Sequence, residues 1–381
     1  MKLWVIANVD LSSRKGGAAH VMQFVRHVCN RGHNVRLFIP RPKGEIPSLP
    51  SDVSLLPRPG SSFWVSHVLF EIIASLLMLR LFFKERPDRI YIRHNLFCLL
   101  PVLVARILGR RAFIEQNGVV SAELEMAGRP QWERSLQDRI ERITYRNCAE
   151  VIAVTEGIRR HLIEDLGVEP NKVHVISNGA DPDVMRPQPA GPARESLGLD
   201  AGCAVVGYVG NFEPYQDLDS FIDALALIKA AGLEFKALIV GGGTRFGEIQ
   251  DRARERGVEQ SCLFLGPKPH LEIADHIAAM DVCVVPKRPL SSGYSPIKLF
   301  EYLACGRPVV ASDLPGFEII KEHGLGVLAA PEDAQELADA VAGLIKDPEL
   351  RREMGKRARA YAEGPGSWAE TVKNVLKVLG G

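Results

Sequence analysis

Short runs of aliphatic and β-branched residues alternate with helix-length amphipathic segments along nearly the whole chain. This alternation is typical of βα units whose strands lie in a parallel sheet. The expected strands form two series, at residues 3–7, 35–39, 89–92, 112–115, 151–154 and 173–176, and at 204–209, 235–240, 263–265, 282–285 and 309–311. The sequence therefore predicts an α/β protein with two Rossmann-like, doubly wound domains that face each other across a cleft.

A proline-rich stretch separates the two series of strands. Four prolines between residues 182 and 192 remove backbone donors and prevent a helix from continuing, which is typical of a linker. We expect an N-terminal domain at 1–185, a C-terminal domain at 186–365, and a C-terminal helix at 366–381 that packs back on the N-terminal domain.

The charge balance argues against one broad class of function. The 381 residues hold 47 Lys and Arg against 46 Asp and Glu, a net charge of +1, so bulk attraction to nucleic acid is not expected. The charge is uneven, because residues 1–187 hold 26 basic and 19 acidic side chains, net +7, whereas 188–381 hold 21 and 27, net −6. The seven cysteines include no Cys-x-x-Cys pair, which predicts reduced thiols in a cytoplasmic protein.

The segment 291–311 has the clearest local signals. Ser295 is a good N-cap, Pro296 suits the first helical position and Gly306 suits the position just after a helix. These residues predict a helix at 296–304.

The start of this helix is a candidate anion site. Its free N–H groups, with Lys298 in the first turn, favour an anion such as a diphosphate. Glu301 lies one turn later, where its carboxylate can accept two hydrogen bonds from a vicinal diol such as a ribose. The alternative is that Lys298 and Glu301 form a solvated ion pair on the helix surface.

Polar residues also follow the strands of the first series. Gly16 and Gly17 open the helix after the first strand, where glycine lets a phosphate or sugar approach the backbone closely. Arg93 and His94 follow the strand at 89–92, and Asn117 follows the strand at 112–115. We expect these residues at the cleft edge of the sheet. The alternatives are a tight turn for the glycines and a structural role for His94.

Several segments together resemble one enzyme family. The segment 291–311 resembles the donor-binding motif of the retaining family 4 glycosyltransferases, two-lobed enzymes of the GT-B fold. Other stretches agree in order and spacing, at residues 175–181, 207–212, 238–243, 264–266, 281–286 and 347–351. The resemblance covers nearly the whole chain.

The resemblance implies transfer of a sugar from a nucleotide diphosphate donor, UDP- or GDP-linked, to a glycan or lipid-linked acceptor with retention of configuration. The C-terminal domain would bind the nucleotide sugar, the N-terminal domain the acceptor, and no metal cofactor would be needed. The donor-binding residues would be Gly16, Gly17, Asn211, Gln216, Gly293, Tyr294, Ser295, Pro296, Ile297 and Glu301. Lys298, Arg93 and His94 would act in catalysis, and Asn117 would contact the acceptor.

The chain also departs from the family pattern. A Glu that contacts the donor sugar in the family is replaced by Gly293, eight residues before Glu301. An Arg and a Lys that bind the donor diphosphate in the family are replaced by Asn211 and Gln216. Lys298 is then the expected replacement cation. Two alternatives stay open, a catalytically silent partner subunit of the same fold and a sugar-nucleotide epimerase.

One apolar segment, at residues 63–83, is long enough to span a membrane. His67, Glu71 and Arg80 interrupt it, so we expect a buried or interfacial helix. With the +7 charge of the N-terminal half, it predicts a peripheral protein on an anionic inner membrane face. The family resemblance implies a role in cell-envelope polysaccharide biosynthesis. The flanking basic residues are Arg80, Lys84, Arg86, Arg89, Arg106, Arg110 and Arg111.

Overall fold

A computed structural model describes residues 1–13, 16–45, 48–57, 63–126 and 128–380. The chain divides into two compact units, unit 1 with Met1–Ser177 and Thr371–Gly381, and unit 2 with Asn178–Glu370. This division falls eight residues before the expected boundary at 185/186. The C-terminal helix α15 (Trp368–Leu379) starts in unit 2 and ends in unit 1.

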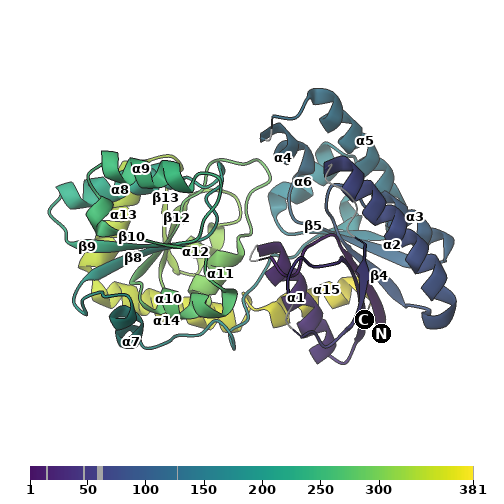
Figure 1. The fold of residues 1–381 in the computed structure, drawn as a ribbon, viewed down its shortest axis with the longest axis horizontal. Coiled ribbons are helices and arrows are strands. Elements are labelled where there is room, and N and C mark those ends of the chain that lie inside the picture. The colour runs from purple at the N-terminus through teal and green to yellow at the C-terminus, as the bar shows by residue number, and fades with distance from the viewer. Residues whose placement is uncertain (14–15, 46–47, 58–62, 127, 381) are drawn as a thin grey trace. The chain divides into compact units, whose positions relative to one another are not determined.

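Unit 1 is built on a seven-stranded parallel sheet with the order β3-β2-β1-β4-β5-β6-β7 (Figure 1). Its strands are β1 (Lys2–Ala7), β2 (Asn34–Pro40), β3 (Asp52–Leu56), β4 (Arg89–Arg93), β5 (Arg111–Gln116), β6 (Glu150–Ala153) and β7 (Val173–Val175). The strand order reverses between β1 and β4. The loops after these two strands therefore lie at a topological switch point, where ligands bind in open α/β sheets.

The helices of unit 1 connect successive parallel strands. They are α1 (Gly16–Asn30), α2 (Phe63–Glu85), α3 (Leu99–Ile107), α4 (Val120–Met126), α5 (Gln131–Asn147) and α6 (Glu156–Glu164). Helix α2 packs against α3, and α3 packs against α5. The buried aliphatic residues of β1, β4 and β5 pack against these helices, as is usual for parallel strands covered on both faces.

Unit 2 repeats the plan with a six-stranded parallel sheet in the order β10-β9-β8-β11-β12-β13. Its strands are β8 (Ala204–Val209), β9 (Phe235–Val240), β10 (Cys262–Gly266), β11 (Val282–Val285), β12 (Val309–Ser312) and β13 (Gly326–Ala329). Its helices are α7 (Ala190–Ser196), α8 (Leu218–Ala230), α9 (Phe246–Glu255), α10 (Ile273–Ala278), α11 (Ile297–Ala304), α12 (Glu318–Glu322), α13 (Ala334–Lys346) and α14 (Pro348–Glu363). The switch point lies between β8 and β11.

The eleven expected strands are all present, and the sequence pattern missed β3 and β13. Both are edge strands, which pair with a neighbouring strand on one side only, and both carry a weak apolar signal. Strand β13 also starts at Gly326, where a Cβ atom would lie 1.8 Å from the carbonyl oxygen of Val309. This close approach explains why a residue unfavourable in strands begins one here.

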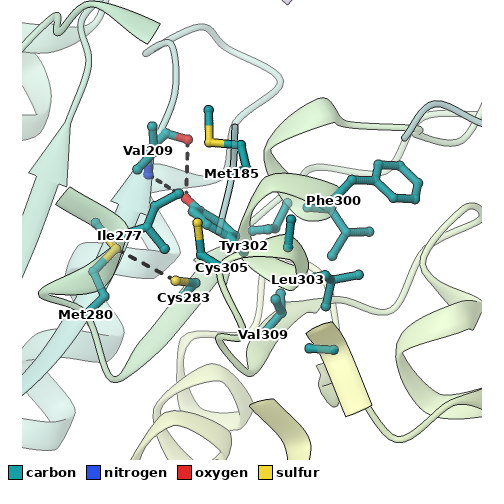
Figure 2. Packing of buried hydrophobic residues seen from close by; sticks show 14 of the residues in the cluster. Met185, Val209, Ile277, Met280, Cys283, Phe300, Tyr302, Leu303, Cys305 and Val309 are labelled. Carbon is teal, nitrogen blue, oxygen red and sulfur yellow. Dashed lines mark hydrogen bonds between the residues drawn. The ribbon is translucent and has the colours of Figure 1, made fainter. Parts of the chain in front are cut away.

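Helix α11 is anchored in the core of unit 2. Its apolar face contributes Phe300 and Leu303 to a large buried cluster (Figure 2). The backbone N–H of Val209 donates a hydrogen bond of 2.6 Å to the hydroxyl of Tyr302, which ties α11 to the carboxyl end of β8. The N-terminus of α11 is thereby held at the switch point of the sheet.

Helix α2 is long and apolar enough to cross a membrane by length and composition, and only 28% of its most apolar window is buried. One such helix is weak evidence for a membrane span. Part of α2 packs into unit 1 through Phe70, Ala74 and Met78, whereas Phe83 near its end is 79% exposed. The helix is therefore partly buried in unit 1, and its expected place at a membrane interface stays a prediction.

Candidate functional site

Lys298 lies in the first turn of α11 and is partly buried. Its Nζ donates a hydrogen bond of 3.3 Å to Oε1 of Gln216 and lies 4.1 Å from the ring centroid of Tyr208. Burial, followed by the charge of Lys287, lowers the pKa of Lys298 well below its usual value, although Glu301 acts in the opposite direction. Among the described residues, the Lys298 ammonium group forms no ion pair.

Gly210, directly after β8, makes room for this lysine. A Cβ atom at Gly210 would lie 2.4 Å from Nζ of Lys298, so any side chain there would displace the ammonium group. Gly210 was not among the site residues expected from the sequence, because its closeness to Lys298 arises only in the folded protein.

Asn211 and Gln216, the residues expected to replace two family cations, belong to the same hydrogen-bond network. Gln216 donates through Nε2 to Oδ1 of Asn211 at 2.7 Å, and Asn211 donates through Nδ2 to the hydroxyl of Tyr215 at 2.6 Å. Gln216 is buried and Asn211 is exposed. The network joins the loop after β8 to the first turn of α11. That these residues bind a donor stays a prediction.

Glu301 lies next to His270 and is 7% exposed. Its Oε1 is 2.7 Å from Nε2 of His270, which follows β10. No ion pair joins Lys298 and Glu301 in the described part of the chain, and each has another partner. The alternative of a solvated pair between these two residues is therefore wrong.

The loop before α11 departs from the expected capping. The N-cap is Pro296, not Ser295, and α11 begins at Ile297. The hydroxyl oxygen of Ser295 instead accepts a hydrogen bond of 3.1 Å from the backbone N–H of Asn178, whose Nδ2 donates to the Ser295 carbonyl at 2.7 Å. A distant segment therefore fixes this loop, a contact that local capping rules cannot foresee. Gly306 follows the C-cap with φ +68°, as expected.

Gly293 and Tyr294 shape the same loop. Gly293 has φ +63°, and a Cβ atom there would lie 2.6 Å from the carbonyl oxygen of Pro315. Tyr294 is mostly buried and donates its hydroxyl to the Arg288 carbonyl at 2.8 Å. The replacement of the family Glu by glycine is therefore built into a turn that leaves no space for a side chain.

Lys287, which the sequence analysis did not single out, lies just after β11. Its Nζ is 4.6 Å from the ring centroid of Tyr215 and 4.5 Å from that of Tyr294. The side chain is 3% exposed, and burial lowers the pKa of Lys287 to about 7. Its position at the carboxyl end of a switch-point strand was the one sequence signal that could have found it.

The structure brings Gly17 and Arg93 together at the switch point of unit 1. A Cβ atom at Gly17 would lie 3.7 Å from Nη2 of Arg93, so the start of α1 lies against this guanidinium group. Gly16, the first residue of α1, is exposed. Nε of Arg93 and Nδ2 of Asn117 are buried without a hydrogen-bond partner in the described part of the chain.

A buried carboxylate lies beside these residues. Glu115, near the end of β5, is 2.6 Å from Nε2 of His20 and accepts a hydrogen bond of 2.5 Å from the hydroxyl of Tyr91. Burial alone would raise the pKa of Glu115, but His20, Arg93 and Tyr91 stabilise its charged form and lower the pKa overall. Neither His20 nor Glu115 was expected, because each lies within a regular element.

His94 packs into the interior of unit 1. Its Nε2 is 3.2 Å from Oε1 of Glu141 on α5, and its ring lies 6.1 Å from that of Tyr145. Burial and the charge of Arg93 lower the pKa of His94, and burial raises the pKa of Glu141, so a neutral pair is favoured. This environment fits a structural role for His94 better than contact with a sugar.

The described residues form no candidate metal site. Among the residues that the structure describes, no three His, Cys, Asp or Glu side chains are grouped so that they could hold a metal ion. The expectation that catalysis needs no metal stays a prediction.

The two Rossmann-like units and their polar switch points define the class of two-domain α/β proteins with the GT-B fold. Two family models match the chain, "Glycosyltransferase Family 4" at residues 14–184 and "Glycosyl transferases group 1" at residues 192–361. The chain therefore belongs to the family 4 glycosyltransferases, as its motifs predicted.

Several similar curated proteins are named D-inositol 3-phosphate glycosyltransferases. The protein from Gordonia bronchialis is 33% identical over 236 residues, which cover 59% of this chain and 51% of that protein. The protein from Nocardia farcinica is 32% identical over 235 residues, with 60% and 51% covered. The chain thus spans about half the length of the curated relatives it matches.

Solved structures match over the whole chain. Sucrose-phosphate synthase from Thermosynechococcus elongatus has a TM-score of 0.83 at 20% identity, covering 99% of this chain and 98% of its own. Anabaena HepE, solved with UDP and glucose, has a TM-score of 0.79 at 20% identity, covering 100% and 99%. At these identities the likeness shows the fold.

Proposed function

We propose that this protein transfers a sugar from a nucleotide diphosphate donor to a glycan or lipid-linked acceptor with retention of configuration. Unit 2 binds the donor and unit 1 the acceptor. The observation that carries the proposal is the Lys298 ammonium group, held at the start of α11 without a carboxylate partner among the described residues. A cation and a helix N-terminus together stabilise the charge that develops on a leaving diphosphate.

The donor is a UDP- or GDP-sugar. That HepE was solved with UDP and with UDP-glucose supports the uridine nucleotide. Glu301 binds the ribose, and the loop residues Gly293, Tyr294, Ser295, Pro296 and Ile297 surround the diphosphate and sugar. Asn211 and Gln216 complete the donor site in unit 2.

Unit 1 contributes Gly16, Gly17 and Arg93 to the reaction and Asn117 to acceptor binding. Arg93 is the stronger catalytic candidate of the neighbouring pair, because His94 is buried against Glu141. In the reaction the acceptor oxygen forms a bond to the anomeric carbon as the bond to the diphosphate breaks. The leaving phosphate oxygen accepts the acceptor's proton, with attack from the same face.

Slow donor hydrolysis separates this proposal from its two alternatives. A transferase without acceptor releases nucleoside diphosphate and free sugar from UDP- or GDP-sugars at a measurable rate. An epimerase would release nucleotide only together with an epimerised sugar, and a silent partner subunit would do neither. Chromatography of the nucleotide and the sugar after incubation with each donor distinguishes the three.

The role of Glu301 is tested by Glu301→Ala. Loss of charge-assisted hydrogen bonds to the ribose should raise the donor KM at least about tenfold. Glu322→Ala, which removes an exposed carboxylate on α12, is the matched control and should leave the donor KM unchanged. Unchanged affinity of Glu301→Ala for the nucleoside diphosphate in calorimetry would rule out the ribose assignment.

We further propose that α2 docks unit 1 on an anionic membrane surface, which would place the protein in the cytoplasm at the inner face of the membrane and in cell-envelope polysaccharide synthesis. One face of α2 exposes an apolar stripe, and basic side chains at Arg80 and Lys84 stand beside it. The stripe consists of Val65, Val68, Ile72, Leu76, Leu79 and Phe83. Apolar burial and attraction to anionic lipid act together on such a helix.

The structure changes which aromatic residues could insert. Phe70 is buried in the core of unit 1, and Phe82 lies under the guanidinium group of Arg110 at 5.4 Å, so only Phe83 is a free anchor among these three. Ile107 on the neighbouring helix α3 is 77% exposed and adds a second apolar contact.

Co-sedimentation with vesicles containing anionic phosphatidylserine tests the docking. The protein should pellet at low salt and less at high salt, and Phe83→Ser should reduce pelleting. No pelleting of the folded protein at low salt would disprove membrane docking without affecting the transferase proposal.

A further inference from the structure

Lys287 and Lys298 lie at the two ends of the loop that follows β11, at the switch point of unit 2. Lys287 comes just after β11, and Lys298 is in the first turn of α11. An antiparallel bridge joins the backbone of Lys287 to Gln216, the residue whose side chain accepts from Lys298. The segment after β8 therefore contacts both lysines.

Both ammonium groups contact aromatic rings. Nζ of Lys287 lies between Tyr215 at 4.6 Å and Tyr294 at 4.5 Å, and Nζ of Lys298 lies 4.1 Å from Tyr208. Cation–π contacts attract an ammonium group but leave its positive charge unneutralised. In the described part of the chain, neither lysine forms an ion pair.

Arg194, another buried cation of unit 2, has a carboxylate partner. Arg194 is 8% exposed, and its guanidinium group lies 2.7 Å from a carboxylate oxygen of Asp281. That arrangement follows the general rule that buried charges are paired. The two lysines depart from this rule, although a buried unpaired cation disfavours the folded state.

The two lysines also repel each other. After burial, the charge of Lys287 is the main influence that lowers the pKa of Lys298. The carboxylate that raises the pKa of Lys298 is that of Glu301, which is hydrogen-bonded to His270 at 2.7 Å. Two neighbouring cations without an anion between them are the arrangement expected of a site that takes an anion with more than one negative charge.

We propose that Lys287 is a second diphosphate-binding residue, which works with Lys298 as a cation pair on the two phosphoryl groups of the donor. This inference rests on the proposed nucleotide diphosphate donor and adds to it a residue at the start of the loop that leads into α11. In the free protein, Tyr215 and Tyr294 hold the Lys287 side chain. On binding, its ammonium group exchanges an aromatic contact for a phosphate oxygen, and no covalent bond forms or breaks.

Calorimetric titration with UDP and GDP tests the pair. Lys287→Met keeps most of the side-chain volume and removes the charge, and it should raise the Kd of the tighter nucleotide at least about tenfold. It should weaken UDP binding more than UMP binding, because the second phosphate loses a partner. Lys287→Gln is the second variant, and Lys346→Met, an exposed lysine at the end of α13, is the matched control.

Thermal unfolding of the same samples separates binding from folding. Removing a buried unpaired charge should raise the Tm of the free protein, so that Lys287→Met is more stable without UDP and gains less Tm from UDP than the parent. A structural lysine would give the opposite result, a lower Tm with unchanged UDP affinity.

The titrations distinguish a wrong assignment of Lys287 from a wrong donor class. If the parent protein binds UDP or GDP and both Lys287 variants bind it within twofold, the inference is overturned while the proposed donor stands. If the parent protein binds neither UDP, GDP nor inorganic pyrophosphate, the proposed donor class and the cation pair both fail.

Discussion

The two units share one sheet plan and place polar residues at the same kind of switch point, but they balance charge there in opposite ways. In unit 1 the carboxylate of Glu115 is paired with His20 and bonded by Tyr91. In unit 2 the ammonium groups of Lys287 and Lys298 rest on aromatic rings. One switch point pairs its charged group internally, and the other holds two lysines that have no carboxylate partner among the described residues.

This difference indicates that the charged groups at the switch point of unit 1 act in stability, whereas those of unit 2 act in ligand binding. A charge paired inside the protein contributes to folding, and its removal leaves the partner buried and uncompensated. A buried charge without a partner disfavours folding and is retained where a ligand supplies the missing anion. The comparison predicts that charge removal destabilises unit 1 and stabilises the free form of unit 2.

The largest effect is expected from Glu115→Gln in unit 1. Breaking this buried pair should lower the free energy of unfolding by about 3–5 kcal/mol. Differential scanning calorimetry measures the change, with Glu164→Gln, an exposed carboxylate on α6, as the control. An unchanged Tm would show that the Glu115 charge is as dispensable as the surface one, and the contrast between the units would be lost.

Lys298→Met comes next. Because negative charge grows on the leaving diphosphate in the transition state, kcat should fall about 100-fold, more than the donor affinity falls. Steady-state kinetics against Lys346→Met measures this. Should kcat stay within twofold of the parent, Lys298 would have no part in catalysis.

Gly293→Glu restores the family carboxylate and should not restore its function. The positive φ of Gly293 and the 2.6 Å approach to Pro315 should lower the free energy of unfolding by about 1–3 kcal/mol. Activity should not rise. The control is Gly343→Glu on α13, where an added Cβ meets nothing within 4 Å and the helix should be tolerant. A gain in rate for Gly293→Glu would mean that the site is an impaired version of the family site.

The smallest effect is a pH dependence of stability in unit 2. Burial lowers the pKa of Lys287 to about 7, and the groups that face it are Tyr215, Tyr294 and Lys298. Between about pH 7 and 10 the unfolded chain binds the proton that the native lysine has lost, so stability should rise with pH in this window. Measuring the Tm of the parent protein and of Lys287→Met across this pH window isolates the contribution of Lys287. If the two curves of Tm against pH run parallel, Lys287 makes no such contribution.

The sequence was a good guide to elements whose signals are local. Strand positions, the turn at Gly293 and the end of α11 at Gly306 follow from apolar runs and from glycine conformations, which a few neighbouring residues determine. Lys298 was expected from its place in the first turn of a predicted helix, and Asn211 and Gln216 from the family resemblance; the structure joins the three in one network. Two of the four edge strands, β3 and β13, were missed because most of their residues are only partly buried, which weakens the apolar pattern.

By itself the sequence determined the two-domain α/β fold, the family and the loops in which polar residues gather, because these depend on periodicity and on residue order. Only the tertiary structure decided what each charge meets. Lys287 and Tyr215 are 72 residues apart, as are many partners in a parallel sheet, and no local pattern reports a contact across such a distance. The Ser295 contact with Asn178, the His270 contact with Glu301 and the burial of His94 against Glu141 were decided in the same way, by packing between elements distant in the chain.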